Sequence, residues 1–207
     1  MIALIDYDAG NMKSVEKALQ LLGEDVLVTR DPKEILAADK VVLPGVGSFG
    51  DAMENLHHFG LVPVIHQVVQ EQTPFLGICL GLQLLFEKSE ESPGVEGLGI
   101  LKGEILRIPA AEGLKIPHMG WNNIRFPNKG RLFAGVPEDA YVYFVHSYYL
   151  KAQDEKIVTA TTEYGTHIHA SVESGNLFAC QFHPEKSSHV GLQILKNFAK
   201  LEGKGGR

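Results

Sequence analysis

The chain has 207 residues, of which 44% are hydrophobic and 21% charged, and its formal net charge is −6. This length is enough for a well-cored α/β domain, and the acidic balance argues against nucleic acid or an anionic membrane surface as a partner. The apolar runs are too short to span a membrane, no signal peptide is apparent, and two cysteines make no disulfide framework, so we expect a cytoplasmic protein.

The first half of the chain alternates between strand-like and helix-like segments. Continuous apolar runs predict buried strands, and apolar residues at helical spacing predict helices. Strands are expected at residues 2–6, 25–29, 40–44 and 74–79, and helices at 12–22, 32–39, 51–72 and 80–89. Gly60 and Pro63 are expected to split the third helix. Such alternation is typical of a parallel sheet with helices on both faces.

From about Gly99 onward the chain is strand-rich. Strands are expected at residues 99–108, 121–126, 140–150, 156–164, 167–174 and 177–183, followed by a helix at 187–201 and a frayed tail at 203–207. We therefore predict a mixed, mostly parallel central sheet in a single α/β domain spanning residues 1–207.

Gly45, Gly47 and Gly50 form a G-x-G-x-x-G pattern, which also occurs in dinucleotide-binding loops. Such a loop should follow the first strand of its unit, and an acidic residue should end the next strand to hold the ribose. Here the glycines follow the third expected strand, and the next strand ends in Cys79. The dinucleotide interpretation is disfavoured. A plain tight turn, or a loop whose backbone N–H groups point into a site, remain open.

Cys79 lies in GICLG, residues 77–81, which has the Gly-x-nucleophile-x-Gly form of a nucleophile elbow at a strand-to-helix junction. The helix dipole there favours a thiolate. We expect the Leu80 N–H to be free at the start of the helix and able to donate to an oxyanion. The alternative for Cys79 is a buried structural cysteine. We predict that role for Cys180, which alternation places between two phenylalanines.

His183 is the best candidate for a base among the nine histidines. Pro184 follows it and favours an extended backbone, in which Glu185 points the same way as His183. The carboxylate can then orient the imidazole, as the third member of a triad does. His167 and His169 share a strand face that we expect to be solvated, because two histidines alone make a poor metal site. Solvated helix surfaces are expected for His57, His58, His66 and His189.

Three motifs together resemble the triad (class I) glutamine amidotransferases over essentially the whole chain. They are P-G-V-G at 44–47, G-I-C-L-G-L-Q at 77–83 and H-P-E at 183–185. The resemblance implies a flavodoxin-like fold, and hydrolysis of glutamine to glutamate and ammonia through a thioester on Cys79. His183 would carry the proton to the leaving ammonia. No metal or organic cofactor is implied.

The same resemblance assigns the glycine loop to an oxyanion site. Backbone N–H groups of Leu80 and of Val46 or Gly47 would hold the oxyanion, and each such donor is typically worth about 3–4 kcal/mol of barrier. Because glycines flank Val46, we hypothesise that its peptide must reorient for full activity. Gln83 and Glu91 would hold the α-amino end of glutamine. The backbone around Ser147 and Tyr148 would hold the carboxylate.

The run K-I-P-H-M-G-W-N, residues 115–122, indicates a partner. It crowds large side chains into an expected loop and contains the only tryptophan, Trp121. Aromatic and methionine side chains are enriched at interfaces, although Trp121 could instead belong to the core. The run resembles one branch of the family, in which the partner is a cyclase subunit with a (β/α)8 barrel. The expected interface residues are Asn11, His118, Met119, Trp121 and Asn122.

Other interpretations remain. Glutaminase subunits of anthranilate, GMP or pyridoxal phosphate synthesis would carry the same triad. A cysteine hydrolase or peptidase of related fold would not explain residues 115–122. A degenerate interaction subunit is disfavoured because Cys79, His183 and Glu185 are all present.

Overall fold

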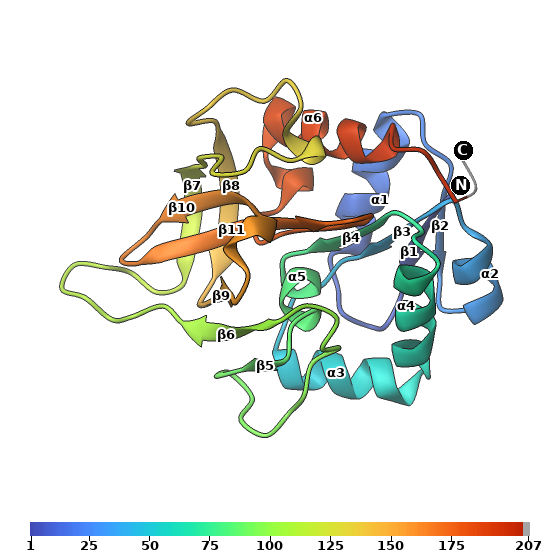
Figure 1. Ribbon diagram of the computed structural model, residues 1–207, viewed down its shortest axis with the longest axis horizontal. Coiled ribbons are helices and arrows are strands. Elements are labelled where there is room, and N and C mark those ends of the chain that lie inside the picture. Colours follow the sequence, from blue (N-terminus) through green and yellow to red (C-terminus); the bar gives the residue numbers. More distant parts are fainter. Residues whose placement is uncertain (205–207) are drawn as a thin grey trace.

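The computed structural model describes residues 1–204 and centres on a seven-stranded sheet (Figure 1). Its strands are β1 (Ile2–Ile5), β2 (Val26–Thr29), β3 (Lys40–Leu43), β4 (Phe75–Ile78), β10 (Val158–Glu163), β11 (His167–Ser174) and β12 (Leu177–Cys180). They lie in the order β10-β11-β12-β4-β3-β1-β2. Neighbours from β12 to β2 pair in parallel, and β10 and β11 add antiparallel pairs. The predicted mixed, mostly parallel sheet is confirmed.

Helices cover both faces of this sheet. They are α1 (Met12–Leu21), α2 (Pro32–Ala37), α3 (Phe49–His58), α4 (Leu61–Gln70), α5 (Leu80–Leu84) and α6 (Ser188–Ala199). The apolar stripes of α1 and α6 pack in one core, and those of α2, α3, α4 and α5 in the other, on opposite faces (Figure 1). Asp31 caps α2 by accepting the Lys33 N–H at 2.7 Å, with Pro32 first in the helix as predicted.

Two helices differ from the sequence prediction. Phe59 and Gly60 separate α3 from α4, and Gly60 holds the left-handed conformation. Pro63 lies in the first turn of α4, where its missing N–H costs no helical hydrogen bond. The helix expected at residues 80–89 ends at Leu84, because Lys88–Ser89 forms strand β5 and pairs with a strand of a second sheet.

The second half builds two smaller sheets. Strands β5, β6 (Gly103–Arg107) and β9 (Tyr148–Ala152) form one, and β7 (His118–Asn123) pairs with β8 (Tyr141–His146) in an antiparallel ribbon. The prediction of a loop at residues 115–122 is therefore wrong for most of that run. Its side chains alternate, with His118 buried and Met119 and Trp121 exposed, but Pro117 and Gly120 obscure the strand pattern.

The C-terminal segment lies against α2 and the residue that precedes β3. The Lys204 N–H donates to the Asp39 carbonyl at 3.2 Å, and its Nζ donates to the Leu36 carbonyl at 3.0 Å. The start of the expected frayed tail is thus attached, and residues 205–207 lie outside the described range. No helix within residues 1–204 has the length and apolar character needed to cross a membrane.

The inner face of the β7–β8 ribbon carries a buried histidine pair. His118 and His146 lie opposite each other in register and are 3% and 6% exposed. The His118 ring stacks on Phe144 and Tyr164, with centroids 4.7 and 3.8 Å apart. Burial lowers the pKa of His118 to about 4 and that of His146 to about 3. Both rings are therefore neutral at physiological pH.

A third buried histidine, His169, was expected to be solvated. His167 is exposed as expected, but His169 is buried, and its Nδ1 accepts the Ala152 N–H at 3.1 Å. Part of the strand face that His167 and His169 share packs against β9. The alternation of residues in β11 cannot reveal this contact with another strand.

We expect the protein to lose stability as the pH falls below about 6.5. Between the unfolded pKa of histidine and a depressed folded pKa, only the unfolded state binds the proton, so the stabilisation present above pH 6.5 is lost on acidification. His146 alone should contribute a slope of up to about 1.4 kcal/mol per pH unit. Urea unfolding from pH 7.5 to 4.5 measures it. His146→Gln should flatten the slope, exposed His57→Gln should not, and an unchanged slope in His146→Gln would contradict the expectation.

Candidate active site

The carboxyl ends of four neighbouring parallel strands meet at one edge of the main sheet. Strands β12, β4, β3 and β1 are adjacent in that order, and the segments after them carry His183, Cys79, Val46 and Asn11. In open parallel sheets this edge is where ligands bind. The fold thereby joins residues that are distant in the chain, such as Asn11 and Glu185, which are 174 positions apart.

Cys79 occupies a sharp turn between β4 and α5. Its φ is 55° and its ψ −109°, a strained conformation for a residue with a Cβ. The turn packs closely against β3, because a Cβ on Gly81 would lie 1.9 Å from the Leu43 carbonyl oxygen. A Cβ on Gly77 would lie 2.7 Å from the Gly81 oxygen. The geometry is that of the predicted nucleophile elbow. Cys180, by contrast, is fully buried in the core, as predicted.

His183 and Glu185 form a buried pair beside the turn. His183 Nδ1 lies 2.8 Å from Glu185 Oε1, and the two side chains are 1% and 0% exposed. A carboxylate can only accept, so Nδ1 carries the proton and Nε2 is left for chemistry. Within residues 1–204, Nε2 has no hydrogen-bond partner of good geometry. Burial lowers the pKa of His183, but Cys79 and Glu185 outweigh it and raise the pKa to about 9.

Asn11 is a further contact of this pair. Its Nδ2 donates to the same Glu185 oxygen at 2.5 Å. Asn11 holds the left-handed conformation, with φ 58°, immediately before α1, which turns its amide inward. The sequence prediction placed Asn11 at a partner interface, whereas the structure places its side chain on the triad carboxylate.

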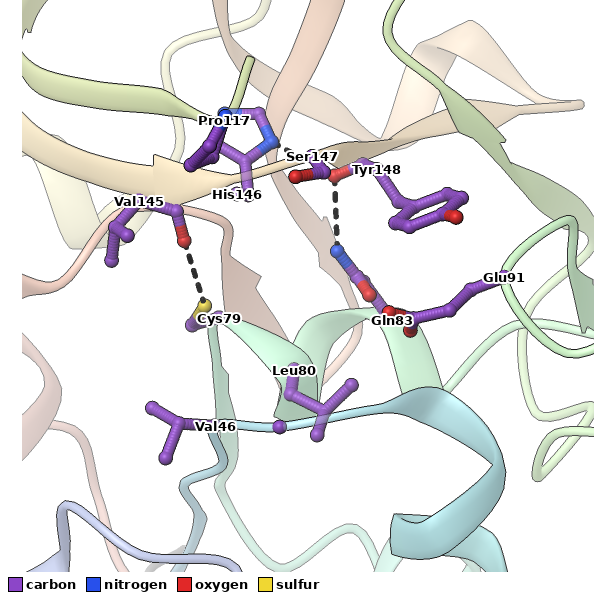
Figure 2. A pocket seen from close by; sticks show the side chains of 11 residues that line it. Val46, Cys79, Leu80, Gln83, Glu91, Pro117, Val145, His146, Ser147 and Tyr148 are labelled. Carbon is purple, nitrogen blue, oxygen red and sulfur yellow. Dashed lines mark hydrogen bonds between the residues drawn. The ribbon is translucent and has the colours of Figure 1, made fainter.

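A cavity of about 300 Å³ opens beside Cys79 (Figure 2). It is lined by every residue predicted to surround the substrate: Val46, Gly47, Cys79, Leu80, Gln83, Glu91, Ser147 and Tyr148. Three further lining residues were not singled out from the sequence: Pro117, Val145 and His146. A concave site of this size, with a few polar groups on an apolar wall, suits a small molecule.

Polar groups in the cavity are held by hydrogen bonds behind it. Gln83 Nε2 donates to the Tyr148 carbonyl at 3.1 Å and to Gln181 Oε1 at 3.0 Å, so its own Oε1 remains available as an acceptor. Glu91 accepts the Phe49 N–H at 2.8 Å, at the N-terminus of α3. Both side chains can thus accept from a cationic group in the cavity.

Two of the three predicted oxyanion donors, Leu80, Val46 and Gly47, are already occupied. The Val46 N–H donates to the Ala9 carbonyl at 3.0 Å, and the Leu80 N–H donates to the Gly45 carbonyl at 3.3 Å. The expectation that the Leu80 N–H is free is therefore wrong, because the glycine loop lies against the start of α5. In this conformation neither group can hold an oxyanion unless the loop moves.

Tyr7, which sequence analysis did not single out, contacts the glycine loop from the buried side. Its side chain is fully buried, and its hydroxyl donates to the Pro44 carbonyl at 2.7 Å. Burial, with a contribution from the charge of Cys79, raises the pKa of Tyr7, so the hydroxyl stays protonated and donating. A Cβ on Gly45 would lie 2.2 Å from this hydroxyl, which explains the glycine there.

The outer face of the β7–β8 ribbon is apolar and exposed beside the cavity. Met119, Trp121 and Tyr141 are 63%, 52% and 58% exposed, so Trp121 is not a core residue. Val145, opposite Met119 in register, lines the cavity. His118 was expected on this interface, but it lies on the inner face of the ribbon and is buried. We call Met119, Trp121 and Tyr141 the ribbon patch.

Comparison with known proteins places this geometry in a family. The model of the family described as glutamine amidotransferase class-I matches residues 3–201. An imidazole glycerol phosphate synthase subunit HisH from Moorella thermoacetica is 58% identical over 97% of this chain and 94% of the relative. One from Methanocaldococcus jannaschii is 48% identical over 97% of this chain and all of the relative.

Solved structures share the fold at low sequence identity. A glutamine amidotransferase crystal structure superposes with a TM-score of 0.74 at 19% identity, covering 96% of this chain and 100% of the other. The glutaminase domain of Trypanosoma brucei CTPS with bound acivicin gives 0.67 at 18% identity, covering 96% and 93%. With the match over residues 3–201 and relatives at about half identity, the chain belongs to the class I glutamine amidotransferase family.

Proposed function

We propose that this protein is the glutaminase subunit of an imidazole glycerol phosphate synthase in histidine biosynthesis. The observation that carries the proposal is the strained Cys79 at the mouth of a cavity, beside the buried His183–Glu185 pair. The relatives that share nearly the full length of the chain carry the name of that enzyme.

The reaction is hydrolysis of the glutamine side-chain amide. The Cys79 thiolate attacks the amide carbon, and the tetrahedral intermediate collapses when His183 Nε2 gives its proton to the departing ammonia. The resulting thioester is attacked by water, whose proton His183 takes up. Glutamate then leaves, and Cys79 is regenerated. Glu185 holds the Nδ1 proton throughout, so Nε2 is the nitrogen that exchanges protons.

The cavity accounts for substrate binding in the same terms. Gln83 Oε1 and the Glu91 carboxylate accept from the α-ammonium group, and the backbone of Ser147 and Tyr148 lies against the α-carboxylate. The ammonia passes to a cyclase subunit, a (β/α)8 barrel, which makes imidazole glycerol phosphate and AICAR. That subunit docks on the ribbon patch, where Trp121 is the aromatic anchor.

Control of the reaction follows from the occupied oxyanion donors. The conformation in which the Val46 N–H donates to the Ala9 carbonyl is the resting one. The Val46 peptide reorients when the cyclase subunit is docked and has bound its nucleotide ligand. Each donor gained is worth about 3–4 kcal/mol of barrier, which is enough to switch the glutaminase.

The first experiment measures ammonia release from glutamine by the purified chain, alone and with the cyclase subunit and its nucleotide ligand. We expect a low rate alone and stimulation of at least about 100-fold in the complex, the value of one oxyanion donor. Cys79→Ser should lack activity in both states. Equal activity of the wild type with and without the partner would assign the chain to another amidotransferase pathway.

Gly47→Pro tests the moving loop. Gly47 has a φ of 108°, which proline cannot adopt, and the ring would also restrict the Val46 peptide. We expect stimulated turnover to fall by roughly 100-fold, since one oxyanion donor is lost, with partner affinity retained. Normal stimulated turnover in this variant would exclude loop reorientation.

Asn11→Gly tests the contact with Glu185. Glycine keeps the left-handed backbone and removes only the donor. Because Glu185 then orients His183 less well, we expect kcat in the complex to fall roughly tenfold, equivalent to about 1.4 kcal/mol, with little change in KM. Gln72→Gly, at another left-handed position far from the site, is the matched control. If kcat did not change, Asn11 would have no part in orienting the triad.

A further inference from the structure

A directional chain of hydrogen bonds joins the β7–β8 ribbon to the cavity. Its direction is set at the inner end, because the Tyr148 carbonyl can only accept, so His146 Nδ1 donates to it across 2.8 Å. The neutral His146 then accepts at Nε2, and His118 Nδ1, 3.0 Å away, must be the donor. His118 in turn accepts at Nε2 from Asn122 Nδ2 at 3.4 Å. Every tautomer is thereby determined.

Burial is consistent with this arrangement. Both rings are almost entirely buried, and burial lowers the pKa of each well below neutrality. If His146 were protonated at Nε2, that N–H would face the N–H at His118 Nδ1, 3.0 Å away, and the hydrogen bond between the two rings would be lost. The chain therefore exists only while both rings are neutral, which they are at the pH of the cell.

The inner end of the chain lies at the candidate substrate site. The Tyr148 carbonyl accepts from Gln83 Nε2 as well as from His146 (Figure 2). Gln83 Nε2 also donates to Gln181 Oε1, and Gln181 Nε2 lies 3.7 Å from Cys79 Sγ. The Tyr148 carbonyl is thus the junction between the histidine pair and the groups around Cys79.

The outer end lies next to the ribbon patch. Asn122 follows the exposed Trp121, and its Nδ2 also donates to the Glu163 carbonyl at 3.0 Å. The His118 ring also stacks on Phe144 and Tyr164, and it is bonded directly to His146. The side chain that joins β7 to His146 is therefore held on several sides.

We propose that His118 and His146 are positioning residues of the glutaminase, forming a relay that holds the Tyr148 carbonyl, and with it Gln83, in the geometry that binds glutamine. Because the relay begins on β7, that geometry depends on how the ribbon patch is engaged. The inference rests on the proposed function, since it assumes that Gln83 and Tyr148 contact glutamine. Neither histidine touches the reacting atoms.

Two exchanges at His146 separate positioning from simple packing. In His146→Asn the amide nitrogen takes the place of Nδ1 and keeps the bond to Tyr148, whereas His146→Gln keeps an acceptor near Nε2 and loses that bond. Packing alone predicts the larger defect for asparagine, which is smaller than histidine and leaves a void. The relay predicts the larger defect for glutamine.

The assay measures KM and kcat for glutamine in the complex with the cyclase subunit and its nucleotide ligand. We expect KM to rise about tenfold or more in His146→Gln and by about fivefold in His146→Asn, which keeps the bond to Tyr148 but loses the one from His118, with kcat changing less than KM in both. The exposed His57→Asn is the control. Equal KM values in the two His146 variants, or the reverse order, would overturn the proposal.

His118→Phe tests the link to the ribbon and still decides the matter if the His146 variants fail to fold. Phenylalanine keeps the stack between Phe144 and Tyr164 but removes both nitrogens. KM should rise at least about fivefold with an unchanged melting temperature, and His118→Asn, which restores the donor to His146, should recover most of it. An unchanged KM in folded His118→Phe would refute the relay. Absence of glutaminase activity in the wild-type complex would instead refute the proposed function.

Discussion

The close approach of α5 to β3 is the constraint on which the rest of this site depends. Gly81 leaves no room for a Cβ against the Leu43 carbonyl, and the chain turns from β4 into α5 through the strained backbone of Cys79. That turn lifts the thiol above the carboxyl edge of the sheet. The same packing places the glycine loop after β3 along the start of α5. There the Gly45 carbonyl accepts a hydrogen bond from the Leu80 N–H.

A buried ion pair is costly unless its members are well paired and hydrogen bonded. In the His183–Glu185 pair only some of the polar atoms have partners. One carboxylate oxygen accepts from both His183 and Asn11, while the other has no partner within residues 1–204. His183 Nε2 likewise has no partner within residues 1–204, and the proposed mechanism uses this nitrogen. Structural polar groups nearby, such as Ser187, are fully bonded, since Ser187 Oγ accepts from the Tyr143 N–H and donates to the His183 carbonyl.

The substrate cavity and the ribbon patch share one short element. Strand β8 presents Tyr141 outward, lines the cavity with Val145 and ends in the buried His146. Its backbone also binds the segment that carries His183, through the bond from the His183 N–H to the Tyr143 carbonyl at 2.9 Å. The proposed docking surface therefore belongs to an element that is hydrogen bonded directly to His183.

The sequence by itself determined what local pattern can encode. Apolar periodicity predicted the parallel strands and most helices, and the motifs around Cys79 and His183 predicted both the elbow and the pair, because each depends on residues close in the chain. Strand β7 was missed because Pro117 and Gly120, which are uncommon in strands, interrupt its local pattern. Tertiary structure alone decided the contacts between distant segments. Asn11 on Glu185, Tyr7 under Pro44, and the burial of His118, His146 and His169 arise where separate strand ends and sheets meet. A single stretch of sequence cannot specify these contacts, because each donor and its acceptor lie on segments that meet only when the whole sheet has formed.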